Sequence, residues 1–348
     1  LGDGMATDLT AALAGAGRLT VVPRSSAFAL RGRTAKEAGD RLQASEVVEG
    51  TIGRAGGRLR VTVSLVNVAN ETVRWSRKYD EDERNVFQLH DSIAGAIVAA
   101  LDGDAGASGR LTVRPPTRSI EAHDLVQRAA FLDNQQASEA SLREAIRLAE
   151  AAVALDSQYV DAWIAIAEGW FSLADTYVAP QEALPHIRSA VTRAAAADPR
   201  SADAHGMLGI VLGAYAYDFP GAESEFQRAL AIDTANVRAS SGYAWQLWAL
   251  GRPDSALAVV RRGLSRNPLS TMLLSPGVSI SIAAGRMDQA NDYCRRYSEL
   301  GPRGAGCEAD RFIAERRYKE AVDVRQRLVA GGGATARQRG LLAQALAL

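Results

Sequence analysis

Apolar residues of alternating size recur at a fixed spacing in the second half of the chain. In the stretch QRALAIDTAN (Gln227 to Asn236) they alternate with polar residues until an aspartate interrupts the pattern. Three apolar residues precede this aspartate, and counterparts stand 34 and 68 positions later: Ala222, Phe226 and Ala229, then Ala256, Val260 and Gly263, then Ala290, Cys294 and Tyr297. A period of about 34 residues, with small side chains where two helices approach, predicts repeated helix-turn-helix units.

This pattern resembles the tetratricopeptide repeat (TPR). Less regular copies lie at residues 144–157, 187–199 and 319–329. A proline or aspartate after the second helix of a repeat stops that helix before the next one begins. We count about six repeats between residues 118 and 348, of which the first and last are degenerate. The resemblance implies stacked repeats that share one core and leave a concave groove lined by the first helix of each. An unrelated helical bundle is the alternative.

The first hundred residues have a different pattern, which predicts a small α+β domain. The first expected helix is Gly4 to Ala14. The second begins at a Thr34–Glu37 capping box and ends near Leu42, and the third follows an Asn85 cap and ends at Leu101. The expected strands are Leu19 to Pro23, a hairpin of Glu46 to Arg54 and Arg58 to Val68, and a strand that contains Val73, Trp75 and Tyr79.

Five segments in this part carry a second resemblance. They are GMATDLTAAL, VVPRSSAFALRG, VVEGTIGRAGGRLRVTVSLVNV, RWSRKYD and VFQLHDSIAGAI. In this order they resemble the TolB amino-terminal-like (FlgO-like) domain of bacterial signalling proteins, which a TPR array often follows. The family's first strand, an apolar run ahead of the first helix, has no counterpart here. The chain also starts at Leu1 without an initiator methionine, so we interpret it as a fragment.

The fold class we expect is an α+β N-terminal domain followed by an all-α TPR superhelix (an α-solenoid), mostly helical overall. The expected division is a TolB-like domain at 1–101 without its first strand, a linker at 102–117 and the TPR array at 118–348. The linker prediction rests on a segment rich in Gly, Ala and Pro, DGDAGASGRLTVRPPT.

Charge and composition narrow the function classes. The chain has 40 basic and 40 acidic residues, a balance that argues against a broad nucleic-acid-binding face. No apolar run approaches the roughly 18 residues of a membrane span. The location stays unknown: the cytoplasm is slightly favoured, and the periplasm is possible if an anchor lies upstream.

No motif in the sequence indicates catalysis, so we expect no catalytic residue, cofactor or metal in this chain. A Walker loop, GxGxxG, HExxH, CxxC and GxSxG are all absent. The four histidines are scattered and are expected to serve packing or the surface. The acidic run Asp80 to Glu83 lacks the spaced oxygens of a calcium loop and is expected to be a solvated turn.

The candidate binding residues come from helical spacing in two neighbouring repeats. Six side chains are expected to face the groove: Arg238, Trp245, Trp248, Met272, Ser275 and Ser279. The alternative is that the tryptophans belong to the core. Cys294 and Cys307 lie on helices that pack together in a TPR array, so they could be close, but we expect two buried free thiols.

These observations favour a protein-binding regulatory or sensory module of a bacterial signalling protein, whose groove takes a protein or peptide. The first alternative is the control region of a larger protein: a class III adenylate or guanylate cyclase, a serine/threonine kinase or a winged-helix regulator. Further alternatives are a small-ligand sensor and a purely structural scaffold. The oligomeric state is not predicted.

Overall fold

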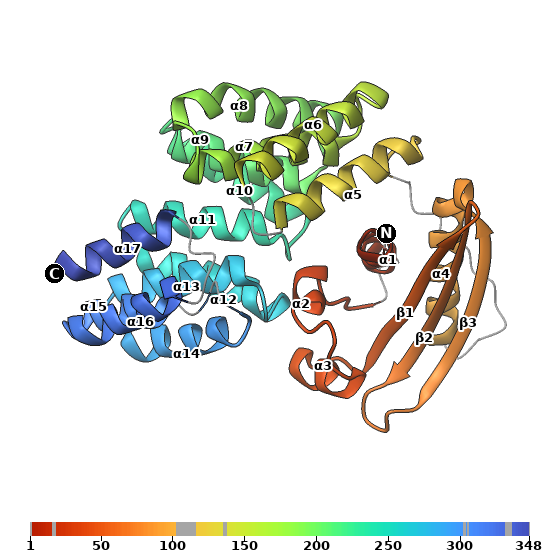
Figure 1. The fold of residues 1–348 in the computed structure, drawn as a ribbon, viewed down its shortest axis with the longest axis horizontal. Coiled ribbons are helices and arrows are strands. Elements are labelled where there is room, and N and C mark those ends of the chain that lie inside the picture. Colours follow the sequence, from red (N-terminus) through yellow and green to blue (C-terminus); the bar gives the residue numbers. More distant parts are fainter. Residues whose placement is uncertain are drawn as a thin grey trace. The chain divides into compact units, whose positions relative to one another are not determined.

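A small α+β part comes first along the chain and only helices follow it (Figure 1), as the sequence predicts. The computed structural model describes residues 2–15, 19–101, 116–134, 138–301, 304, 306–330 and 336–347. They form two compact units, residues 1–135 with 147–162 and residues 136–146 with 163–348. Of the predicted linker, residues 102–115 lie outside the described residues, and the predicted domain boundaries remain predictions.

The α+β part contains a three-stranded antiparallel sheet in the order β1-β2-β3. Its elements are α1 (Gly2–Gly15), α2 (Arg24–Phe28), α3 (Ala35–Leu42), β1 (Glu46–Ala55), β2 (Arg58–Asn67), β3 (Val73–Asp82), the 3₁₀ turn η1 (Glu83–Asn85) and α4 (Val86–Leu101). Gly56 and Gly57 form the β1–β2 turn at φ 58° and 75°, a left-handed conformation that glycine adopts without strain and that suits the twist of a two-residue hairpin. The capping box is also present: Thr34 Oγ1 accepts from Glu37 N, and the Glu37 carboxylate accepts from Thr34 N.

The core of this part lies between one face of the sheet and two helices. The alternating residues Leu59, Val61, Val63 and Leu65 of β2 are all at most 3% exposed. Leu59, Val61 and Val63 pack with apolar residues of α1 and α4 in one cluster, to which Leu19 and Val21 also contribute. The period-two pattern of β2 therefore places one complete face in the core, as its sequence predicts.

Two local predictions in this part are wrong. Residues 19–23 form no strand: the described strands pair only with one another, so the apolar side chains of this segment serve burial rather than a ladder. Asn85 does not cap α4 but lies in the 3₁₀ turn that runs into it. The cap of that turn is Asp82, whose carboxylate accepts from Arg84 N at 2.9 Å.

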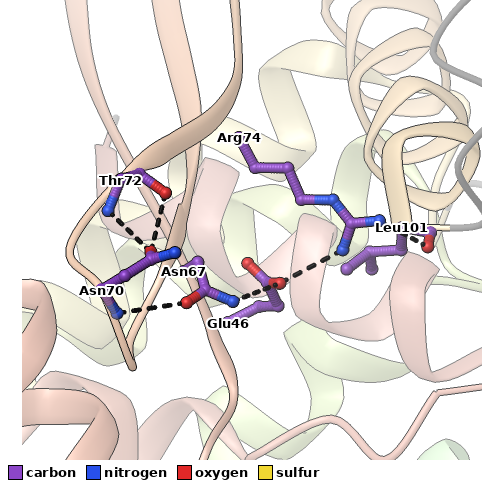
Figure 2. Close-up of polar contacts among 6 residues, drawn as sticks. All are labelled: Glu46, Asn67, Asn70, Thr72, Arg74 and Leu101. Carbon is purple, nitrogen blue, oxygen red and sulfur yellow. Dashed lines mark hydrogen bonds and ion pairs between the residues drawn. The ribbon is translucent and has the colours of Figure 1, made fainter.

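A bulge in β3 connects the sheet to the end of α4. Leu65 faces Trp75 and Val66 faces Val73, so the register skips Arg74. Figure 2 shows the Arg74 guanidinium donating to Glu46 Oε1 at 3.2 Å and to the carbonyl of Leu101, the last residue of α4, at 3.2 Å. The bulge thus turns one cation toward a helix C-terminus, where the backbone carbonyls favour positive charge.

The same contacts reach the β2–β3 turn. Asn67 Nδ2 donates to Glu46 Oε1 at 3.2 Å, and the Asn67 side-chain oxygen accepts from the backbone of Asn70 (Figure 2). Asn70 in turn accepts from both the backbone and the hydroxyl of Thr72, at 3.1 and 2.7 Å. Short polar side chains thereby replace backbone partners in this turn.

The helical part follows residue 116 as six consecutive pairs and a final helix. Its members are α5 (Ile120–Asn134), α6 (Glu139–Leu155), α7 (Val160–Thr176), α8 (Pro180–Ala197), α9 (Ala202–Ala214), α10 (Phe219–Ile232), α11 (Val237–Ala249), α12 (Pro253–Arg266), α13 (Thr271–Ala283), α14 (Met287–Ser298), α15 (Cys307–Ala314), α16 (Tyr318–Ala330) and α17 (Ala336–Ala347). From α9 onward the partners of each pair contact each other, and the first helices α9, α11, α13 and α15 contact in succession. This is the stacking of an α-solenoid. None of the helices within the described ranges has the length and apolar character that a membrane span requires.

The periodic residues of the sequence are the ones that hold successive pairs together. Phe226 of α10 is 1% exposed, and the backbones of Gly209 and Gly242 lie against its ring. A β-carbon at either glycine would approach that ring to 2.7 Å. Small residues therefore stand where α9 and α11 pass closest to α10, for the steric reason that the spacing suggested.

The expectation of two free thiols was wrong. Cys294 and Cys307 form a disulfide between α14 and α15, with their α-carbons 5.7 Å apart. Both residues are nevertheless buried, and both belong to the apolar cluster that runs from α11 to α15. Burial alone does not separate a buried thiol from a buried disulfide, because both replace water by apolar contacts.

Candidate functional site

The two tryptophans of α11 are among the more exposed large apolar residues of the array. Trp245 is 37% exposed and Trp248 is 40% exposed, whereas Leu247 between them is 1% exposed. The two indole rings meet edge to face, with centroids 5.6 Å apart. One side of α11 thus packs in the core while the other presents two adjoining aromatic rings to solvent.

The N-terminus of α11 is fixed by its cap. The side chain of Asn236 accepts from Ala239 N at 2.8 Å and donates through Nδ2 to Asp203 Oδ1 of α9 at 2.9 Å. One asparagine thereby satisfies a free helix donor and sets the rotation of α11 against α9. Because helical positions then follow at 100° intervals, this rotation also sets the direction of the tryptophans.

Arg238 is held inside the array and is not a free anchor. Its guanidinium donates to Glu168 Oε1 of α7 and lies 3.8 Å from Asp203 Oδ1 of α9. It also donates to the sulfur of Met207 at 3.3 Å. Only 20% of the Arg238 side chain is exposed, so this residue first of all joins three successive first helices of the solenoid.

The other candidates lie on α13. Met272 is 46% exposed, and Ser275 and Ser279 are half-buried on the same helix. We call Trp245, Trp248, Met272, Ser275 and Ser279 the aromatic face. Its role in binding remains a prediction.

A buried polar cluster in the first unit escaped sequence reasoning. Asp8 of α1 lies 2.9 Å from His90 Nδ1 of α4 and 3.2 Å from His123 Nε2 of α5, and both imidazoles are 5% exposed. Burial by itself raises the pKa of Asp8, but the contacts with His123 and His90 outweigh it, so this pKa lies below its ordinary 3.8. The cluster fits the expectation that these histidines serve packing; no local pattern connects its three residues, which are far apart in sequence.

The acidic run Asp80 to Glu83 is not the expected solvated turn. Asp80 and Asp82 belong to β3 and Glu83 to η1. Hydrogen bonds from Arg58 and Arg60 lower the pKa of Asp80, and those from the side chain and backbone of Arg84 lower the pKa of Asp82. Three carboxylates of the run, those of Asp80, Asp82 and Glu83, are therefore paired with arginines.

The first unit also contains an open cleft of about 850 Å³. The β1–β2 turn, the end of β3 with η1, and α5 line it. Arg58, Arg84 and Arg128 line it together with carboxylates that include Glu121 and Asp124. Ile120 and Leu125 add an apolar part to its lining. In the part of the chain that the structure describes, no three His, Cys, Asp or Glu residues are placed to hold a metal ion.

Comparisons with known proteins agree with the helical architecture. A model of the tetratricopeptide repeat family matches residues 214–273, which run from the end of α9 into α13. The human IFIT1 dimer with m7Gppp-AAAA has a TM-score of 0.51 at 15% identity, covering 71% of this chain and 56% of that one. A tetratricopeptide repeat protein from Parabacteroides merdae has a TM-score of 0.49 at 15% identity, covering 75% of this chain and 94% of that one. The chain contains a TPR array.

One curated relative matches part of this chain. The putative adenylate cyclase 3 of Rhizobium meliloti (strain 1021) is 29% identical to this chain over 131 residues. The match takes in 36% of this chain and 22% of the relative. The chain therefore spans about a fifth of the relative that it matches.

Proposed function

We propose that this chain is a protein-binding regulatory or sensory module of a bacterial signalling protein, and that the aromatic face of its TPR array contacts a protein or peptide partner. The observation that carries the proposal is the pair of adjoining, partly exposed indole rings on α11. Exposed aromatic side chains on a rigid scaffold are typical binding anchors, because they offer a large contact area at a small entropic cost.

The resemblance of residues 1–101 to the TolB amino-terminal-like domain supports the signalling part of this proposal. The structure has an α+β part ahead of the helices, as that resemblance implies. The rhizobial relative, whose name is that of a cyclase, supports it from a second direction.

The test is selection of binding peptides from a random-sequence display library on the folded chain, followed by calorimetric affinities. We expect the double variant Trp245→Ala with Trp248→Ala to bind the selected peptides at least tenfold more weakly, a loss of about 1.4 kcal/mol in binding free energy. Tyr217→Ala is the matched control, since Tyr217 is 73% exposed but lies between α9 and α10. Selected peptides that bind the double variant and wild type equally would contradict the proposed surface.

The rhizobial match favours one second candidate, the control region of a larger effector protein such as a class III cyclase. Its test is the reading frame ahead of the codon for Leu1. A cyclase, kinase or winged-helix domain there supports this candidate, and the next assay is effector activity with and without this chain. A frame that adds only a start codon or signal peptide contradicts it.

A further inference from the structure

The Cys294–Cys307 disulfide joins two consecutive repeat pairs. Cys294 lies on α14, and Cys307 is the first residue of α15. The bridge closes a segment of 13 residues. It therefore holds the beginning of the terminal pair, α15 and α16, against the pair before it.

The terminal pair has little core of its own. Among the described residues, its buried cluster consists of Ala309, Ala321 and Val324, with Phe312, Ile313 and Leu328 partly buried around it. The preceding cluster is larger and includes both cysteines. The contacts of this pair with the pair before it are made mainly by α15, on α13 and α14, whereas α16 packs on α15 and on α17. The attachment of the pair to α14 therefore depends on α15 and on the bridge.

The surroundings of Cys307 suit it as a leaving group in thiol–disulfide exchange. It stands in the first turn of α15, where backbone N–H groups without helical partners favour negative charge. Ser298 Oγ lies 3.5 Å from Cys307 Sγ and donates to the Gly304 carbonyl at 3.3 Å, so its hydroxyl can donate to a thiolate once it turns away from that carbonyl. Of the acidic residues nearby, Asp310 is paired with Arg325, and Glu299 and Glu308 are exposed. A stabilised leaving thiolate makes exchange faster.

Access is from the side of the other cysteine. A cavity of about 490 Å³ lies beside the bridge, and its wall includes Cys294, Arg295, Ser298 and Arg311 but not Cys307. Cys294 is 3% exposed, so we expect a small thiol in this cavity to reach its sulfur when the wall opens locally.

We propose that Cys294–Cys307 is a reversible thiol–disulfide exchange site, whose reduction by a small dithiol releases the terminal repeat pair from the array. One thiolate of the dithiol attacks Cys294 Sγ, a new sulfur–sulfur bond forms as the bridge breaks, and Cys307 leaves as a thiolate and takes up a proton. The second thiolate of the dithiol closes its own disulfide and releases Cys294, which is protonated. The chain gains two electrons and two protons, and the dithiol is oxidised.

The site is separate from the aromatic face, and its chemistry stands or falls independently of what that face binds. Its state follows the redox poise of the compartment, because cytosolic reductants keep thiols reduced whereas a periplasm or extracellular space oxidises them. In the oxidised chain the pair of α15 and α16 is docked on α14, and in the reduced chain the array can open between α14 and α15.

The test is hydrogen exchange of the full chain, oxidised or treated with dithiothreitol, measured by mass spectrometry. Opening a loop of this size should raise exchange in α15 and α16 on the order of a hundredfold, while α9 to α11 stay unchanged. The variant Cys294→Ala with Cys307→Ala should exchange like the reduced wild type and ignore dithiothreitol. Ser298→Ala should slow reduction without changing the protection of the oxidised chain.

Three results would overturn the proposal. Alkylation could find both thiols free in the air-oxidised protein. Dithiothreitol could fail to reduce the bridge unless the chain is first denatured. The reduced and oxidised chains could exchange alike in α15 and α16. The order of attack is read by treating the oxidised chain with a small monothiol, quenching with acid and mapping the peptides: the mixed disulfide should lie at Cys294.

Discussion

Replacing Gly242 by alanine tests the packing that defines the repeat array. Alanine is the better helix former, and inside α11 its lower conformational entropy cost should stabilise the helix by about 1 kcal/mol. The added methyl, however, would lie 2.7 Å from Phe226 Cε1 and 2.8 Å from Ile210 Cγ1. Phe226 is 1% exposed and has no room to move away.

The clash outweighs the propensity gain. Overpacking of a close-packed interior costs about 1–3 kcal/mol, and contacts below 3 Å with both Phe226 and Ile210 place Gly242→Ala in the upper half of that range. After the propensity gain of about 1 kcal/mol is subtracted, the free energy of unfolding should fall by about 1–2 kcal/mol. Urea unfolding followed by helical circular dichroism measures this change. Gly340→Ala is the matched control: Gly340 is exposed in α17 with no atom within 4 Å of an added methyl, so that variant should be at least as stable as wild type.

A second substitution separates the clash from other causes. Phe226→Leu removes part of the ring that the new methyl meets. The losses of unfolding free energy in the two single variants should therefore sum to more than the loss in the double variant Gly242→Ala with Phe226→Leu. A Gly242→Ala protein as stable as wild type would refute the reasoning, because α9, α10 and α11 would then not approach as closely as their small residues indicate.

Three further changes probe other parts of the chain. Trp245→Ala with Trp248→Ala should cost less stability per residue than Leu247→Ala, which should cost about 2–5 kcal/mol in thermal or urea unfolding; the reverse order would place the indoles in the core. Asp8→Asn should lower the free energy of unfolding at neutral pH, because the lowered pKa of Asp8 means that its ionised form stabilises the fold. This contribution is complete above about pH 3.8 and is lost as the pH falls through the pKa of the folded state. The difference from wild type should therefore shrink in acid urea titrations, and a constant difference would exclude the ionised carboxylate as its cause. Arg74→Ala should cost about 1 kcal/mol or less and should speed hydrogen exchange in the last turn of α4, whereas unchanged exchange there would show that its contact with Leu101 does not hold the helix end.

The sequence by itself determined most of the elements and their order. A 34-residue recurrence of small and large apolar residues marks close helix approaches, and alternation in β2 marks a buried sheet face; both are properties of local geometry. The Thr34 capping box and the Gly56-Gly57 turn are likewise local, and both appear where they were expected.

Only the tertiary structure decided which distant residues meet. Arg238 pairs with Glu168, 70 positions away, and Asp8 meets two histidines from different helices. The apolar pattern of residues 19–23 suggested a strand, but a strand exists only when a neighbour supplies its hydrogen bonds. Cys294 and Cys307 pair because the stacking of α14 and α15 brings their α-carbons to 5.7 Å. Such contacts depend on how elements are rotated and placed against each other, which no local spacing encodes.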